Sequence, residues 1–173
     1  MTMNQPSPTS TRQESQPQSI TSARKSLGWV LLNALLDGNE REQRKAIDAI
    51  VAPPADCKSD CPLILLLRAQ RTLLGSSRER LHEILRRLSR NLVPQLIEMI
   101  PQRKGGDLHQ LLDLARVLAS PELVPPIKKV IENGDRWSGV FAIQSLSAIH
   151  APDARAVIIR ALDNPELRWS AVA

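Results

Sequence analysis

Two cysteines, Cys57 and Cys61, lie four positions apart in a polar segment that also contains Asp56 and Asp60. Thiolate and carboxylate groups are zinc ligands, but a structural zinc site needs four of them. The chain has no second cysteine pair, and its three histidines fall in other predicted helices or turns. Cys57 and Cys61 are therefore weak candidates for a metal site. A reversible disulfide and two ordinary loop thiols are the alternatives, and we expect no resident cofactor.

The histidines give no sign of a catalytic site. His82, His109 and His150 are 27 and 41 residues apart, and no serine or cysteine beside them forms a recognisable nucleophile elbow. No glycine-rich phosphate loop is present, because Gly105-Gly106 fits a turn before a helix. The sequence thus indicates a binding protein more than an enzyme.

Basic residues are concentrated in the middle of the chain. Residues 68–104 contain nine Lys or Arg and three acidic residues, whereas the whole chain has a net charge of +5. In the predicted helix 78–90, Arg86 and Arg90 lie four positions apart and share one face. Glu83 lies at helix-pair distance from these arginines, which favours a solvated, salt-bridged face. Nucleic-acid binding through this helix is the alternative, and the scarcity of lysine and of aromatic rings argues against it.

The elements that must position these residues are all predicted to be helices. Residues 1–25 are rich in Ser, Thr, Gln and Pro, so we expect a disordered tail there. Residues 26–173 show helical periodicity and no strand pattern. The proline-flanked stretch 52–62 interrupts them as an inserted loop. The predicted helices are 26–36, 40–51, 62–75, 78–90, 92–103, 107–119, 121–132, 135–149, 152–163 and 165–173.

Capping residues set these helix starts. Asn39 and Glu42 have the spacing of a capping box, and Ser76 with Glu79 has the same spacing. Asp107 and Asp135 each follow a glycine and are predicted N-caps. The links between helices are two to four residues long, so neighbouring helices must be antiparallel.

A repeated segment marks the C-terminal half of the chain. Arg136-Trp137-Ser138-Gly139-Val140 recurs as Arg168-Trp169-Ser170-Ala171-Val172, 32 residues later. Ser120-Pro121-Glu122-Leu123 is echoed by Ala151-Pro152-Asp153-Ala154. Such a period is typical of stacked supersecondary units. The pattern resembles HEAT-like repeats of the short form found in phycobilisome lyases and bacterial scaffold proteins. It is specific over 120–173, looser over 78–119 and degenerate over 26–75.

The resemblance implies an all-α fold, an α-solenoid of stacked antiparallel helix pairs over 26–173. It also implies a non-catalytic scaffold or adaptor that binds another protein. Second helices commonly line the concave side of such arrays, so Lys128, Lys129, Arg155 and Arg160 would form a mildly basic inner surface for an acidic segment. A bilin lyase-like protein or chaperone subunit is the alternative that the resemblance allows.

The two copies of the repeated segment have different expected roles. Arg136 would brace its turn, and Trp137 would pack between repeats, with an exposed anchor for a partner as the alternative. Trp169 and Val172 begin a last repeat that is incomplete, and they would leave an apolar edge open to a partner or to a second copy of the chain. We expect no membrane span and no signal peptide, and two cysteines without an export signal favour the cytoplasm.

Overall fold

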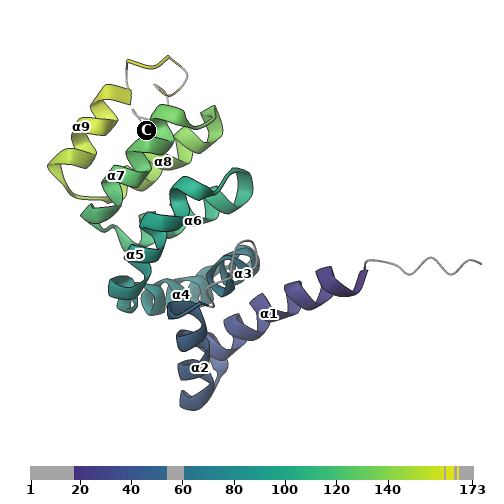
Figure 1. Cartoon of the computed structure of the whole chain (residues 1–173). Coiled ribbons are helices and arrows are strands. Elements are labelled where there is room, and N and C mark those ends of the chain that lie inside the picture. The colour runs from purple at the N-terminus through teal and green to yellow at the C-terminus, as the bar shows by residue number, and fades with distance from the viewer. Residues whose placement is uncertain (1–17, 54–60, 162, 166, 168–173) are drawn as a thin grey trace, which may run out of the picture.

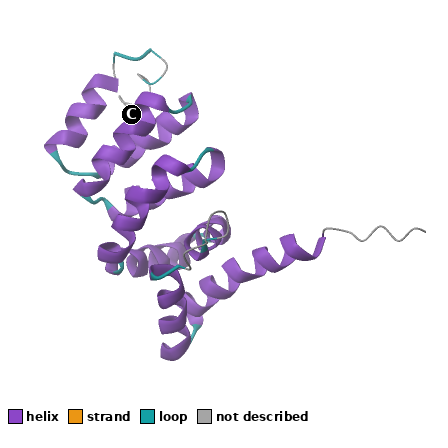
Figure 2. Ribbon diagram, viewed as in Figure 1, coloured by secondary structure: helices purple, strands orange, loops and turns teal. Residues whose placement is uncertain are grey.

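The computed structural model describes residues 18–53, 61–161, 163–165 and 167, with side chains from residue 27 onward. This part of the chain is all-α and contains no strand (Figures 1 and 2). None of its helices is long and apolar enough to cross a membrane. The helices are α1 (Gln18–Asp37), α2 (Glu40–Val51), α3 (Pro62–Ala69), α4 (Gly75–Arg87), α5 (Ser89–Met99), α6 (Gly105–Leu118), α7 (Val124–Asn133), α8 (Arg136–Ala148) and α9 (Pro152–Ala161), with short 3-10 turns η1 (Gln70–Thr72), η2 (Ile100–Gln102) and η3 (Pro121–Leu123).

Side-chain caps fix the starts of two helices. The Asn39 side chain accepts a hydrogen bond from the Glu42 N–H at 3.1 Å, and the Glu42 carboxylate accepts one from the Asn39 N–H at 3.0 Å, which confirms the predicted capping box of α2. Asp135 accepts a hydrogen bond from the Ser138 N–H at 3.0 Å and caps α8, as predicted. Each cap stabilises its helix by about 1 kcal/mol.

Two other predicted caps are wrong, and glycine is the reason in both cases. Helix α4 begins at Gly75, and α6 begins at Gly105, both with φ of 56°. Glycine adopts a positive φ without steric cost, so the chain can turn into the helix there without a side-chain cap. Ser76 therefore lies inside the first turn of α4. Asp107 lies inside the first turn of α6, where it accepts two hydrogen bonds from the Arg68 guanidinium at 3.0 and 2.8 Å.

The helices pack in two connected rows. In the first row α1 packs on α3, α3 on α6, and α6 on α8. In the second, α5 with η2 packs on α6 and α7, and α7 packs on α8 and α9, while α2 packs against α1. A leucine-rich core runs through both rows, with Leu32, Leu67 and Leu111 fully buried. Figure 1 shows the chain progressing from α1 and α2 at one end to α9 at the other.

The ends and the inserted loop differ from prediction or lie outside the described residues. Helix α1 begins at Gln18, before the predicted start at residue 26, and residues 1–17 are outside the described part. The predicted helix 62–75 ends at Ala69 and continues as the turn η1. Of the predicted loop 52–62, residues 54–60 are outside the described part. Of the predicted last helix, 165–173, only residues 165 and 167 are described, and both lie in turns.

Candidate functional site

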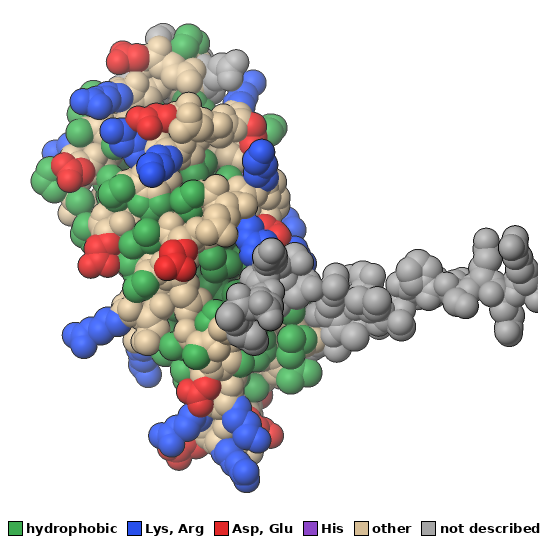
Figure 3. Space-filling model, in the orientation of Figure 1, with side chains coloured by type: hydrophobic (Ala, Val, Ile, Leu, Met, Phe, Trp, Pro, Cys, Tyr) green, Lys and Arg blue, Asp and Glu red, His purple; other side chains and the backbone are tan. Residues whose placement is uncertain are grey.

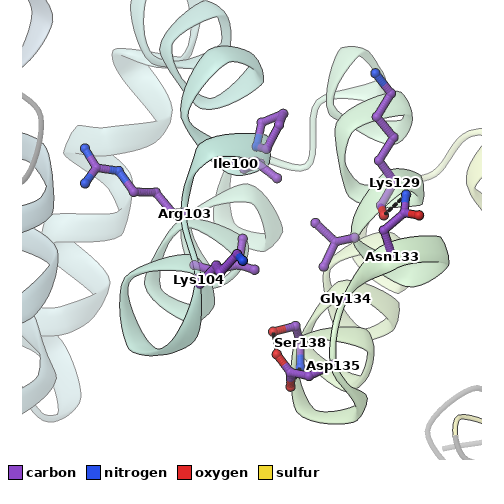
Figure 4. Close-up of a pocket in the computed structure, with 11 residues that line it drawn as sticks. Ile100, Arg103, Lys104, Lys129, Asn133, Gly134, Asp135 and Ser138 are labelled. Carbon is purple, nitrogen blue, oxygen red and sulfur yellow. Dashed lines mark hydrogen bonds between the residues drawn. The ribbon is translucent and has the colours of Figure 1, made fainter.

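A groove of about 500 Å³ lies between η2 and the start of α6 on one side and α7 and the start of α8 on the other (Figure 4). We call it the α6–α8 groove. Its base is apolar, because Ile100, Leu108 and Val130 line it and are 1 %, 5 % and 7 % exposed. Pro101 also lines the groove and lies within η2, where a 3-10 turn follows α5. An apolar base with few polar groups is typical of binding sites.

Lysines stand on both walls of the groove. Lys104 precedes α6 and Lys129 lies on α7, so they belong to opposite sides of the groove (Figure 4). Arg103 also lines the groove, but its guanidinium points away from the facing wall. Among the described residues none of these three cations has an ion-pair partner. Neighbouring Lys128, in contrast, pairs with Glu132 in the same helix at 3.6 Å. With Asp135 as the one carboxylate in the described part of the chain that lines the groove beside these three cations, the groove has a net positive charge.

A chain of hydrogen bonds closes one end of the groove. The Ser138 hydroxyl donates to Asp135 Oδ2 at 2.7 Å, and His109 Nε2 lies 3.3 Å from the same Ser138 Oγ. Since the only hydroxyl proton of Ser138 goes to Asp135, His109 must donate through Nε2–H, which fixes its tautomer. Hydrogen bonds from the Ser138 hydroxyl and N–H lower the pKa of Asp135 below its usual value.

These three residue types also make up hydrolytic triads, but their order here excludes that chemistry. A triad places the histidine between the serine and the acid so that it can take the serine proton. Here Ser138 lies between His109 and Asp135, is fully buried, and donates its proton to the acid. The hydrogen bonds among these three side chains instead connect α6 to α8. The His109 ring stacks on the Phe141 ring, with 4.4 Å between the ring centroids, and reinforces that contact.

The predicted basic inner surface is only partly brought together. Lys129 lines the groove, whereas Lys128 is held by its salt bridge. Arg155 and Arg160 are exposed on α9 and do not line the groove. On the face shown in Figure 3, blue and red side chains alternate over the molecule, and no continuous basic stripe crosses it.

The predicted arginine-rich helix 78–90 is divided. Helix α4 ends at Arg87, so Arg90 lies on the next helix, α5, and the expectation of one continuous face with Arg86 is wrong. Arg86 and Arg87 both pair with Glu83, at 3.6 and 3.2 Å. The Arg86 Nε also donates to the Val117 carbonyl at 3.3 Å. Internal partners thus neutralise much of this helix.

Of the predicted cysteine pair, only Cys61 is described. Its thiol is free and 2 % exposed, at the residue before α3. Cys57 lies outside the described residues, as do Trp169 and Val172. Among the described residues no three His, Cys, Asp or Glu side chains are grouped to hold a metal ion.

Trp137 corrects the expectation drawn from the repeated segment. The side chain is 67 % exposed, so it does not pack between helices. The Arg136 side chain is also exposed and has no hydrogen-bond or ion-pair partner among the described residues. The buried members of the segment are Ser138 and Gly139. The i+3 spacing of Ser138 from the capping Asp135 is the sequence signal for its inward position.

In comparisons with known proteins, no family model, no curated protein and no solved structure matches this chain.

Proposed function

We propose that this protein is a non-catalytic binding module whose α6–α8 groove takes an acidic, amphipathic segment of another protein. The observation that carries the proposal is an apolar base lying between two lysines, Lys104 and Lys129, that have no ion-pair partner in the described part of the chain. Apolar side chains of the segment would cover the base, and its carboxylates would face the two lysines.

We further propose that the helices form an α-solenoid of the HEAT-like type. The successive packing of α1, α3, α6 and α8 supports it, because each first helix then contacts the first helix of the next pair. Helices α6 and α8 begin at residues 105 and 136, close to the period of the repeated segment. The groove then lies between two successive pairs, which is where such arrays present extended binding surfaces.

The positive charge of the groove rim favours a partner segment with negative charge. Exposed ion pairs contribute about 0.2–1 kcal/mol each, and reversing a charge replaces attraction by repulsion of similar size. Reversal of the charge of both lysines should therefore weaken the binding of an acidic segment by roughly 1–3 kcal/mol, which corresponds to an increase in Kd of about 5–150-fold. Burial of apolar side chains on the base supplies the rest of the affinity.

A short random peptide library displayed on phage and panned against the protein tests this proposal. We expect enriched sequences that combine Asp or Glu with Leu, Ile or Phe. A synthetic peptide of the enriched sequence should bind the K104E/K129E variant at least about 5-fold more weakly than the unmodified protein. The matched control is R155E/R160E, which reverses two exposed charges on α9 and should bind normally.

Three results would contradict the proposal. The first is a failure to enrich any sequence, and the second is enrichment of sequences without acidic residues. The third is a loss of binding in R155E/R160E with normal binding in K104E/K129E. That third outcome would favour the α9 surface as the binding face.

A further inference from the structure

Helix α1 is apolar on almost every side, although only one of its sides covers the core. Residues 27–36 include a single polar side chain, Asn33. Leu32 is fully buried, and Gly28 faces α3 so closely that an added Cβ would clash with the Leu65 carbonyl oxygen. A helix that is apolar on all sides is normally buried on all sides. The outer side of α1 is thus an apolar surface that nothing in the described part of the chain covers.

Three residues form a stripe on this outer side, which we call the α1 stripe: Leu27, Val30 and Ala34. Their spacing of i, i+3 and i+7 places them on one side of the helix. Leu27 and Val30 are 42 % and 60 % exposed, and Ala34 is partly exposed. In the sequence of α1 the same spacing continues toward the N-terminus as Ala23 and Ile20. A seven-residue apolar repeat of this kind is typical of helices that pair with another helix.

The position of α1 in the fold leaves the stripe open. In the row formed by α1, α3, α6 and α8, α3 has a neighbour on each side, whereas α1 is the first member and has one neighbour. Figure 1 shows α1 extending beyond the other helices at this end of the molecule. A helix at the free end of such a row normally has a polar outer face. The apolar stripe indicates that this end is covered in solution.

A second copy of the same helix fits the stripe in size. In an antiparallel pair, Leu27 of each copy lies opposite Ala34 of the other copy, so a large side chain meets a small one at both ends. The two Val30 side chains then meet at the centre of the pair. Such a surface is complementary to itself under two-fold rotation, as the interface of a symmetric dimer must be.

The charges of α1 favour the antiparallel arrangement. Arg24 and Lys25 lie in its N-terminal half, and Asp37 ends it. Asp37 is exposed and has no ion-pair partner among the described residues, and a negative charge in the last turn opposes the helix macrodipole. The register that sets Leu27 opposite Ala34 also sets Asp37 opposite residue 24 of the second copy. A parallel pair would instead bring like charges together.

We infer that the α1 stripe is the interface of a homodimer in which the α1 helices of two copies pack antiparallel. The stripe is separate from the α6–α8 groove, which is lined by residues of η2, α6, α7 and α8 and the segments beside them. Pairing through α1 therefore uses none of the groove residues, and the dimer has two grooves.

Size-exclusion chromatography with light scattering, over a series of protein concentrations, tests the inference on the full chain. One copy has a mass of 19.2 kDa, and we expect the measured mass to rise toward twice this value. V30E places two carboxylates at the centre of the pair, so it should raise the dimer Kd by about 100-fold or more. The matched control is I159E, because Ile159 lies on α9 and is 57 % exposed. It should dimerise like the unmodified protein.

Charge reversal tests the antiparallel arrangement. D37K sets a lysine opposite Arg24 of the second copy and should raise the dimer Kd by about 5-fold or more. The double variant R24E/D37K again sets opposite charges against each other and should regain the dimer. In a parallel pair each of these residues would face its own counterpart, so D37K would have little effect.

The inference is overturned if the mass stays at 19.2 kDa at every concentration, or if V30E dimerises as tightly as the unmodified protein. The antiparallel arrangement is overturned if D37K leaves the dimer unchanged or if R24E/D37K does not regain it. A protein that stays monomeric but binds vesicles of phosphatidylcholine and phosphatidylglycerol would assign the α1 stripe to a membrane surface instead. Val30 and Asp37 are exposed in the single chain, so their variants should keep the fold and bind the panned peptide normally. Failure of the dimer and failure of the groove can thus be told apart.

Discussion

Substitution of Ser138 by alanine should destabilise the protein by removing the centre of the hydrogen-bond chain between α6 and α8. The hydroxyl is fully buried, donates to Asp135 at 2.7 Å and lies 3.3 Å from His109 Nε2. Asp135 would keep the bond from the residue 138 N–H, since that group belongs to the backbone. His109 Nε2–H, however, would lose its acceptor in a part-buried position. Leaving a buried donor unsatisfied costs about 1–3 kcal/mol.

Equilibrium unfolding in urea measures this loss, with Ser147→Ala as the control. Ser147 lies on the same helix, is exposed, and its hydroxyl donates only to the Gln144 carbonyl at 2.8 Å. Its removal should change the free energy of unfolding by less than about 0.5 kcal/mol. For a chain of this size, a loss of 1–3 kcal/mol lowers Tm by roughly 2–12 °C. Equal stability of the Ser138 and Ser147 variants would refute the proposed link between α6 and α8.

Three further predictions concern stability. Burial, and after it the nearby arginines, lower the pKa of His82 from its usual 6.5. As the pH falls below 6.5, the unfolded chain takes up a proton more readily than the folded chain, so the free energy of unfolding should fall. His82→Gln should reduce this pH dependence of the free energy of unfolding, measured by urea titrations at several pH values. Gly139→Ala should change stability by less than about 1 kcal/mol, because its Cβ would lie 2.7 Å from Leu167 Cδ2, a side-chain end that must shift, while alanine gains about 1 kcal/mol over glycine inside a helix. Gly106→Ala enters open space and should be neutral or stabilising in a thermal melt. Trp137→Ala should change stability by less than about 0.5 kcal/mol, since the ring is 67 % exposed, and a larger loss would restore the packing interpretation.

The helices were largely predictable because their starts depend on local chemistry. The capping box at Asn39 and Glu42 fixes α2 over the range that the sequence predicts, and Asp135 fixes the start of α8. Where glycine replaces a capping side chain, as at Gly75 and Gly105, the prediction misplaced the start by two or three residues. A serine or aspartate that follows such a glycine has the composition of a cap without its geometry.

The groove could not be predicted from sequence because its parts come from distant positions. Lys104 and Lys129 are 25 residues apart, and only the packing of α7 against η2 and α8 places them across one apolar base. The prediction that Trp137 is packed was wrong for a related reason. A tryptophan is usually buried, but the helical periodicity that starts at the capping Asp135 directs Ser138 inward and Trp137 outward. Residue type alone does not specify which face of a helix meets its neighbour.

Methyl NMR of the ¹³C-labelled protein, titrated with the acidic peptide enriched by panning, is the direct test of the proposed binding of an acidic segment in the α6–α8 groove. The methyl signals of Ile100, Leu108 and Val130 should shift together and saturate with the same Kd. The proposed function is wrong if these three signals stay in place while methyl groups elsewhere, such as the exposed Val30 on α1, respond to the peptide.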